Sequence, residues 1–182
     1  MATNFATTSE FDMMNHDQHA AMKYALNTLG REPAELKDGQ KRAIRAFFSG
    51  KDTMVVLPTG YGKSLVYQVA PLCADFLQHV KDCGCNDVSH IQHHNIAVVI
   101  SPLIALMADQ VKQMGSKGIT AMNISAAKTT SEKLKLSEGK YSIVFATPES
   151  LMKSGMGILH TSVYRQNVCG IFVDEGHCIA KW

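Results

Sequence analysis

The sequence predicts an α/β fold with a mostly parallel β-sheet and helices on both of its faces. Short, apolar, β-rich runs alternate with helical patterns along the chain, and several of these runs stop at a small polar residue followed by proline. Continuous apolar strands separated by helices are typical of a parallel sheet that is buried on both faces. In such sheets ligands bind beyond the carboxyl ends of the strands.

Length and composition favour one intracellular domain. The chain has 182 residues and a net charge of +2, which neither indicates nor excludes nucleic acid as a partner. Its five cysteines are odd in number and irregularly spaced, which favours a reducing compartment over a disulfide framework. We read no secretory signal and no membrane helix, and we expect the nucleus in a eukaryote or the cytoplasm otherwise.

The predicted elements follow one another in a regular order. Residues 1–20 are polar and lack periodicity, which predicts a flexible leader before a folded domain at 21–182. Helical periodicity predicts helices at 21–29, 39–48, 64–78, 103–114, 130–136 and 149–153. Apolar β-rich runs predict strands at 53–57, 95–100, 119–123, 141–146 and 170–173.

A polar segment rich in cysteine and histidine, residues 79–94, interrupts this alternation and predicts a surface insertion. Within it, Cys83 and Cys85 suggest a metal site that His90, His93 and His94 could complete. One residue separates the two cysteines, whereas paired zinc ligands usually have about two to four residues between them. We therefore expect a solvated loop with free thiols rather than bound zinc.

The run from Pro58 to Ser64 has the setting of a P-loop, because it follows a predicted strand and opens a predicted helix. Its glycines allow a tight turn that brings backbone N–H groups toward phosphates. Lys63 is expected to reach the β- and γ-phosphates of ATP, and the Ser64 hydroxyl is expected to hold Mg²⁺. The expected cofactor-binding residues of this loop are Thr59, Gly60, Tyr61, Gly62, Lys63 and Ser64.

Two adjacent carboxylates, Asp174 and Glu175, end the last predicted strand. A strand-end aspartate can hold the Mg²⁺ of a nucleotide. The neighbouring glutamate can orient or deprotonate an attacking water. An Asp-Glu pair alone is a weak signal, but a strand end downstream of a P-loop makes it a strong one. We expect Lys63, Asp174 and Glu175 to form the catalytic group.

These motifs resemble those of RecQ-type DNA helicases of helicase superfamily two, over about Leu26 to Trp182. The resemblance rests on motif 0 at 39–44, motif I at 57–68, motif Ia at 99–111, motif Ic at 146–151 and the DExH motif II at 174–179. Motifs I, Ia and II in this order are specific. The resemblance implies that the fold is a RecA-like P-loop lobe, incomplete because the chain stops just after motif II.

The resemblance also implies roles for residues outside the P-loop and the carboxylate pair. Gln40 would hydrogen-bond the adenine edge, and Lys37 stands where the family has an arginine near adenine. His177 of motif II would couple the nucleotide to DNA. Contacts to single-stranded DNA, made to phosphates without reading sequence, would come from Ser101, Pro102, Thr147 and Pro148.

The implied function is that of an ATP-dependent 3′-to-5′ DNA helicase, an ATP hydrolase of DNA repair and recombination that uses ATP and Mg²⁺. The second RecA-like lobe lies outside this sequence, so we expect the chain alone to unwind no duplex. Two alternatives stay open: a nucleotide- and DNA-binding fragment without turnover, and an RNA-directed DExH relative. The second stays open because phosphate contacts do not sense the 2′-hydroxyl.

The implied fold also places the strand after motif II between the predicted strands at 53–57 and 170–173. These two strands would then flank an empty slot. Unpaired strand edges recruit other chains, so we expect the isolated chain to be marginally stable or prone to aggregation.

Overall fold

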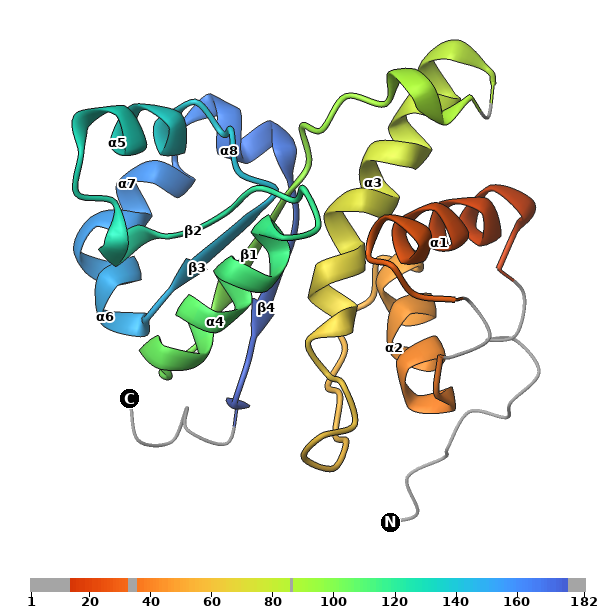
Figure 1. Cartoon of the computed structure of the whole chain (residues 1–182), viewed down its shortest axis with the longest axis horizontal. Coiled ribbons are helices and arrows are strands. Elements are labelled where there is room, and N and C mark those ends of the chain that lie inside the picture. The colour runs from red at the N-terminus through yellow and green to blue at the C-terminus, as the bar shows by residue number, and fades with distance from the viewer. Residues whose placement is uncertain (1–13, 33–35, 86, 177–182) are drawn as a thin grey trace.

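The computed structural model describes residues 14–32, 36–85 and 87–176, which form an α/β fold (Figure 1). The helices are α1 (His16–Thr28), α2 (Asp38–Phe48), α3 (Leu65–Cys83), α4 (Ile104–Gly115), α5 (Thr130–Ser137), α6 (Pro148–Ser150), α7 (Met156–Leu159) and α8 (Ser162–Asn167). The strands are β1 (Ile96–Ile100), β2 (Ala121–Asn123), β3 (Ile143–Ala146) and β4 (Val168–Val173). Short 3₁₀ turns lie at Val88–His90 and Ile124–Ala126, and a π-helical turn at Leu151–Gly155 joins α6 to α7.

The four strands form one parallel sheet in the order β2-β3-β1-β4. In its centre, Val98 of β1 lies between Val144 of β3 and Ile171 of β4. Because every pairing is parallel, the strands end at one edge of the sheet. Hydrogen bonds continue past that edge, since the Asp174 N–H donates to the Ile100 carbonyl at 2.8 Å. The predicted parallel sheet is thereby confirmed.

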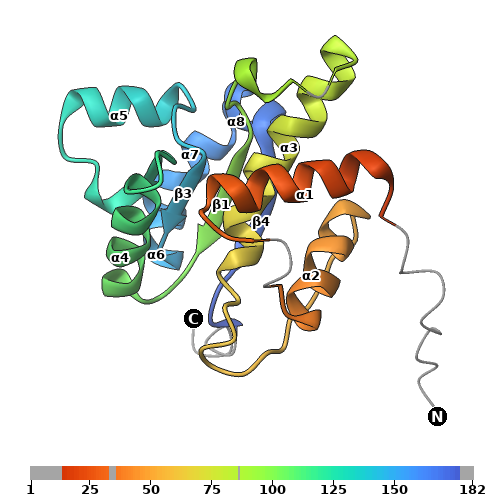
Figure 2. The ribbon, with the colours of Figure 1, turned by 45° about the vertical axis from the view of Figure 1, so that its right-hand side comes forward.

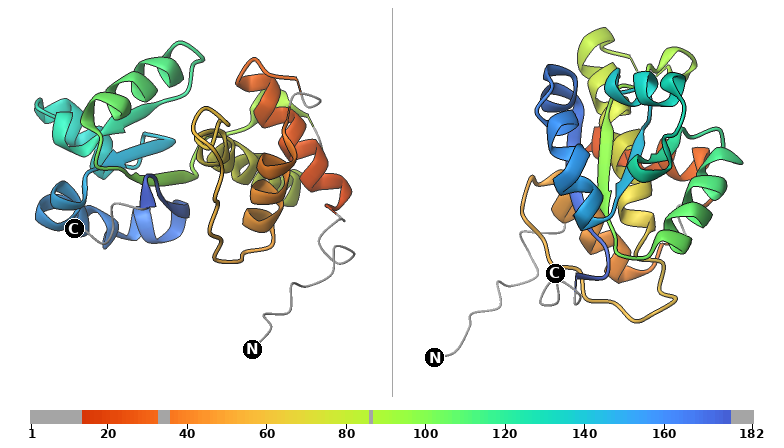
Figure 3. Two further views of the ribbon diagram at one scale, coloured as in Figure 1. Left: turned by 90° about the horizontal axis from the view of Figure 1, so that it is seen from below. Right: turned by 90° about the vertical axis from the view of Figure 1, so that its left-hand side faces the viewer.

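Helices cover both faces of the sheet, as predicted (Figure 3, right). Alternate residues of a strand point to opposite faces, so β1 contributes to two cores. Ala97 and Val99 pack in a larger core with α1, α2, α3 and α4, whereas Ile96 and Val98 pack in a smaller core with α5 and α8. Tyr164 of α8 is fully buried in the smaller core and donates its hydroxyl to the Leu136 carbonyl at 2.8 Å.

The first helix begins earlier than expected. Asn15 caps α1 by accepting from the Gln18 N–H at 2.8 Å, and the Gln18 side chain accepts from the Asn15 N–H at 3.0 Å. This capping box starts the helix at His16, so the expected leader of 20 residues is too long. Residues 1–13 of that leader lie outside the described residues. The helix packs across α3 through Ala21, Ala25 and Leu26 (Figure 2).

The strand expected at 53–57 is absent, which corrects the sequence prediction. Residues 51–58 form an extended segment without strand pairing, and the side chains of Met54 and Val56 are 88% and 81% exposed. A β-rich run becomes a strand only beside a partner strand. Here β4 pairs with β1 on one side, and on its other side pairs with no strand of the described residues. The structure therefore shows one open sheet edge at β4 rather than two strands flanking a slot.

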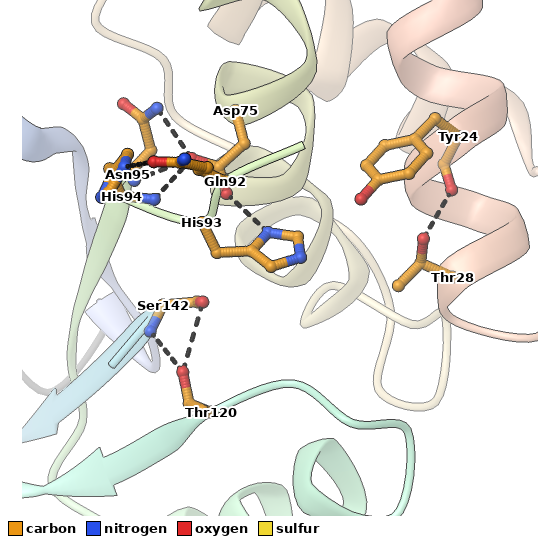
Figure 4. A network of polar contacts seen from close by, with 9 residues as sticks. All are labelled: Tyr24, Thr28, Asp75, Gln92, His93, His94, Asn95, Thr120 and Ser142. Atoms are coloured by element: carbon orange, nitrogen blue, oxygen red, sulfur yellow. Dashed lines mark hydrogen bonds and ion pairs between the residues drawn. The ribbon is translucent and has the colours of Figure 1, made fainter. Parts of the chain in front are cut away.

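The predicted insertion is partly helical, because α3 continues to Cys83 before the chain leaves it. Asp75 of α3 anchors the connection that follows (Figure 4). Its carboxylate is buried and accepts from the N–H groups of His94 and Asn95 at 3.0 and 2.8 Å, and from the Asn95 side-chain amide at 2.9 Å. The His93 ring contacts its other oxygen at 2.9 Å. These bonds fix the chain immediately before β1.

Candidate nucleotide-binding site

The loop before α3 lies at the carboxyl edge of the sheet. In Figure 1 this loop and the end of β4 both lie at the bottom of the molecule. Gly60 and Gly62 adopt φ values of 77° and 83°, a left-handed backbone conformation that residues other than glycine rarely adopt. The Tyr61 N–H donates to the Pro58 carbonyl at 3.2 Å and closes a turn around Gly60. The sequence therefore forms the tight loop that a P-loop requires.

This loop offers backbone donors to an anion. Within the described parts of the chain, no hydrogen bond is made by the backbone N–H groups of Gly60, Gly62, Lys63 and Ser64. They come directly before α3, a helix of 19 residues whose N-terminus carries a partial positive charge. Unsatisfied donors at a helix N-terminus are the groups that bind phosphate in proteins. The residues present thus fit a nucleotide phosphate.

The side chain of Gln40, on α2, holds the loop in position through hydrogen bonds. Its side chain is 4% exposed, and its Nε2 donates to the carbonyls of Tyr61 and Gly62 at 3.0 Å each. Its Oε1 accepts from the Lys37 N–H at 3.0 Å. Both N–H groups of the amide are therefore committed to the loop, so in this structure Gln40 positions the loop. The expected contact of Gln40 with adenine stays a prediction.

Close packing joins the first turn of α2 to the loop. The Lys37 ammonium lies 4.5 Å from the centre of the Tyr61 ring, a cation–π contact. A Cβ at Gly39 would lie 2.5 Å from Cδ2 of Leu57, and a Cβ at Gly62 would lie 2.6 Å from Nε2 of Gln40. A side chain at either position would displace the end of the Leu57 or Gln40 side chain, and at Gly62 it would also be strained by the positive φ. Gly39 is a site residue that the sequence analysis did not single out.

The charges of Lys63 and Asp174 act on each other at the carboxyl edge of the sheet. The ammonium of Lys63 donates to the Leu57 carbonyl at 3.3 Å. Asp174 is half-buried at the end of β4, and burial raises the pKa of its carboxyl, while the positive charge of Lys63 acts to lower that pKa. Because burial disfavours the charged form of this carboxylate, a bound cation would stabilise that form. Lys63 and Asp174 thus provide a site with opposite charges at the carboxyl edge.

The Tyr67 hydroxyl interacts with both Ser64 and Asp174. The sequence did not point to Tyr67 as a site residue. Burial and the negative charge of Asp174 raise the pKa of the Tyr67 hydroxyl, and a hydrogen bond with Ser64 lowers it. Tyr67 is buried on α3 between the two groups expected to hold Mg²⁺. Only its place one turn after Ser64 could have pointed to it.

The Glu175 backbone lies in a conformation unusual for its residue type. Its φ is 54°, and it is the single non-glycine residue with positive φ among the described residues. Its N–H donates to Oδ1 of Asp174 at 3.0 Å. Such backbone conformations cluster at functional sites. The expected coupling residue His177 lies outside the described residues.

The expected DNA contacts lie at the ends of β1 and β3. Ser101 is 1% exposed, donates its N–H to the Ala146 carbonyl at 3.0 Å, and accepts from the Leu103 N–H at 3.4 Å. Thr147 is 8% exposed and caps α6 by accepting from the Ser150 N–H at 3.1 Å. Each hydroxyl thus accepts one hydrogen bond from a backbone N–H within the protein. Pro102 and Pro148 follow them, and Pro148 is the first residue of α6.

Comparisons with known proteins agree with this geometry. Residues 37–182 match the DEAD/DEAH box helicase family. The chain is 34% identical to "ATP-dependent DNA helicase RecQ" of Haemophilus influenzae over 150 residues, 80% of this chain and 21% of that protein. It is 32% identical to "ATP-dependent DNA helicase Q-like 4B" of Arabidopsis thaliana over 155 residues, 80% of this chain and 12% of that protein. The matched region thus spans 21% and 12% of the length of these two relatives.

A solved structure has the same fold. It is the DUF1998 helicase MrfA bound to DNA and AMPPNP, with a TM-score of 0.61 at 20% identity over 90% of this chain and 22% of that chain. Among the residues that the structure describes, no helix combines the length and the apolar character needed to cross a lipid bilayer. The RecQ helicases are homologues of the protein, and the chain belongs to the DEAD/DEAH box helicase family.

Proposed function

We propose that this chain binds ATP and Mg²⁺ as the first motor lobe of a RecQ-type, 3′-to-5′ DNA helicase. The observation that carries the proposal is the loop at residues 60–64, whose free backbone N–H groups lie beside Lys63 and share an edge of the sheet with Asp174. Its relatives are named ATP-dependent DNA helicases, and the helicase of similar fold was solved with DNA and AMPPNP. By the same relation we place it in DNA repair and recombination.

The charge and hydrogen-bonding groups of each site residue determine which part of Mg²⁺-ATP it binds. The N–H groups of Gly60 to Ser64 and the Lys63 ammonium bind the phosphates. Ser64 and Asp174 hold Mg²⁺ with oxygen ligands, and Glu175 accepts a proton from water. When bound, ATP supplies the phosphoanhydride that is hydrolysed, and Mg²⁺ neutralises the charge of its phosphates.

In this structure the Lys63 ammonium makes a weak hydrogen bond, which a phosphate can replace. Its bond to the Leu57 carbonyl is long, at 3.3 Å, and its acceptor is neutral. A phosphate oxygen carries a negative charge and therefore attracts the ammonium more strongly than a neutral carbonyl oxygen does. A phosphate therefore competes successfully with this carbonyl for the ammonium.

We place single-stranded DNA across the carboxyl ends of β1 and β3. The Ser101 and Thr147 side chains are buried and each hydroxyl accepts one backbone hydrogen bond. The backbone and the rings of Pro102 and Pro148 lie beside them in the chain. These groups hold a strand without reading its bases.

The test is a titration of the chain with a fluorescent ATP analogue in the presence of Mg²⁺. Lys63→Ala removes a charge-assisted contact of about 1.5–3 kcal/mol. It should therefore weaken binding by at least about tenfold. The matched control is Lys135→Ala, which removes an exposed lysine of α5. Equal affinities of the Lys63 and Lys135 variants would exclude the P-loop assignment.

Turnover measurements separate the proposed motor from its alternatives. ATP hydrolysis stimulated by single-stranded DNA supports the DNA motor. Nucleotide binding without hydrolysis supports a binding fragment, and stimulation by RNA alone supports an RNA-directed relative. The same Lys63→Ala protein is the blank for each assay.

A further inference from the structure

Three soft ligand atoms meet at the carboxyl end of α3, far along the helix from the phosphate loop. His79 and Cys83 are four residues apart and so lie on one face of the helix. Gly84 follows with φ 67° and donates its N–H to the Val80 carbonyl at 2.8 Å, which ends the helix and turns the chain back. This turn brings Cys85 to the same face. Both cysteines are free and exposed.

The distances between these atoms approach those of a tetrahedral zinc centre. Nε2 of His79 lies 3.3 Å from Sγ of Cys83 and 3.9 Å from Sγ of Cys85. Zinc bonds of about 2.3 Å to sulfur and about 2.05 Å to nitrogen place such pairs about 3.6 Å apart at the tetrahedral angle. The two sulfur atoms are 2.8 Å apart and would separate to about 3.8 Å around zinc. Rotation of exposed side chains allows that change.

We propose that His79, Cys83 and Cys85 form a site for one Zn²⁺ ion, with a water molecule as the fourth ligand. Thiolate and imidazole favour zinc over Mg²⁺ and Ca²⁺, which take oxygen ligands. The sequence favoured free thiols because only one residue separates the two cysteines, and its candidate histidines were His90, His93 and His94 rather than His79. His93 contacts the carboxylate of Asp75, and His94 contacts the side chain of Gln92 (Figure 4).

The ion would fasten the connection between α3 and β1 at its first turn. Asp75 already fastens the end of this connection through His94 and Asn95. A zinc site at Cys83 and Cys85 would hold the start to the same helix.

The experiment measures metal uptake by the reduced full chain, purified without chelator or affinity tag. Zinc is titrated against a chromophoric chelator, and Co²⁺ is used as a spectroscopic probe of thiolate and imidazole ligands. We expect one zinc per chain and a sulfur-to-cobalt charge-transfer band. His79→Gln, Cys83→Ser and Cys85→Ser should each weaken zinc binding by at least tenfold. His90→Gln, an exposed histidine of the same connection, is the matched control and should leave it unchanged.

Each outcome decides the proposal. Because the three ligands are at the surface or near it, the variants should keep the urea midpoint of the metal-free protein, which shows that they fold. Loss of the cobalt band in Cys83→Ser or Cys85→Ser together with its retention in His90→Gln supports the site. Absence of stoichiometric zinc in the reduced protein overturns it, and so does zinc that remains in the variant lacking both cysteines. No nucleotide is present, so the result is independent of the proposed ATP site.

Discussion

Replacing Gln40 by alanine removes three hydrogen bonds at the first turn of α2, and two of them join this turn to the phosphate loop. Two run from Nε2 to the carbonyls of Tyr61 and Gly62, and one runs from the Lys37 N–H to Oε1. A typical hydrogen bond contributes about 0.5–1.5 kcal/mol to stability, so the three sum to about 1.5–4.5 kcal/mol. Tyr61 and Gly62 are partly exposed, and water can replace part of the loss. We expect the free energy of unfolding to fall by about 1.5–3 kcal/mol.

Urea unfolding followed by circular dichroism measures this change. With a urea dependence of about 2 kcal/mol per molar, a loss of 2 kcal/mol lowers the midpoint by about 1 M. Gln113→Ala is the control, because Gln113 is an exposed glutamine of α4. A Gln40→Ala midpoint equal to that of the control would refute the bracing role.

The same variant distinguishes bracing from adenine recognition. Both N–H groups of the amide are bound to the loop, and only one lone pair of Oε1 is left for a base. We therefore expect Gln40→Ala to weaken ATP and GTP binding by the same factor. A loss confined to ATP would assign adenine recognition to Gln40.

Two further predictions concern the anchor of β1 and the glycines of the loop. The hydrogen bond with Asp75 raises the pKa of His93 in the folded protein. Protonated His93 therefore stabilises the fold fully below the ordinary histidine pKa of about 6.5. This contribution to the free energy of unfolding is lost as the pH rises through the raised pKa. The urea midpoints measured at pH 6 and at pH 8 should differ less in His93→Gln than in the wild type. If the two proteins show the same difference between these pH values, groups other than His93 cause the pH dependence. Gly62→Ala should destabilise the chain more than Gly60→Ala, because both have positive φ but only a Cβ at Gly62 lies 2.6 Å from Gln40. Equal urea midpoints would contradict this contact.

The fold could be predicted where local pattern and burial agree. The runs at 95–100 and 141–146 are mostly apolar, and their apolar parts form the central strands β1 and β3. The run at 53–57 has the same composition but lies beside no strand, so composition alone misled the prediction. The short helix α8 was missed because only Tyr164 of its six residues is buried, which leaves no apolar stripe.

The candidate site was predictable in its residue types but less so in its contacts. The P-loop run and the Asp-Glu pair can each be recognised in the sequence, and in the structure the charge of Lys63 acts on Asp174. The bond between Gln40 and the loop spans more than twenty residues, and no local pattern encodes it. The meeting of His79 with Cys83 and Cys85 depends on how far α3 extends, which a polar sequence does not reveal.

The Mg²⁺ dependence of ATP binding tests the central claim, that the loop at 60–64 and Asp174 form one metal–nucleotide site. The measurement is the affinity for a fluorescent ATP analogue with Mg²⁺ and with chelator. Wild type and Asp109→Asn, which changes an exposed aspartate of α4, should bind more tightly with Mg²⁺. Asp174→Asn should bind with an affinity that Mg²⁺ leaves unchanged. An Asp174→Asn protein that keeps the wild-type response to Mg²⁺ would contradict the account.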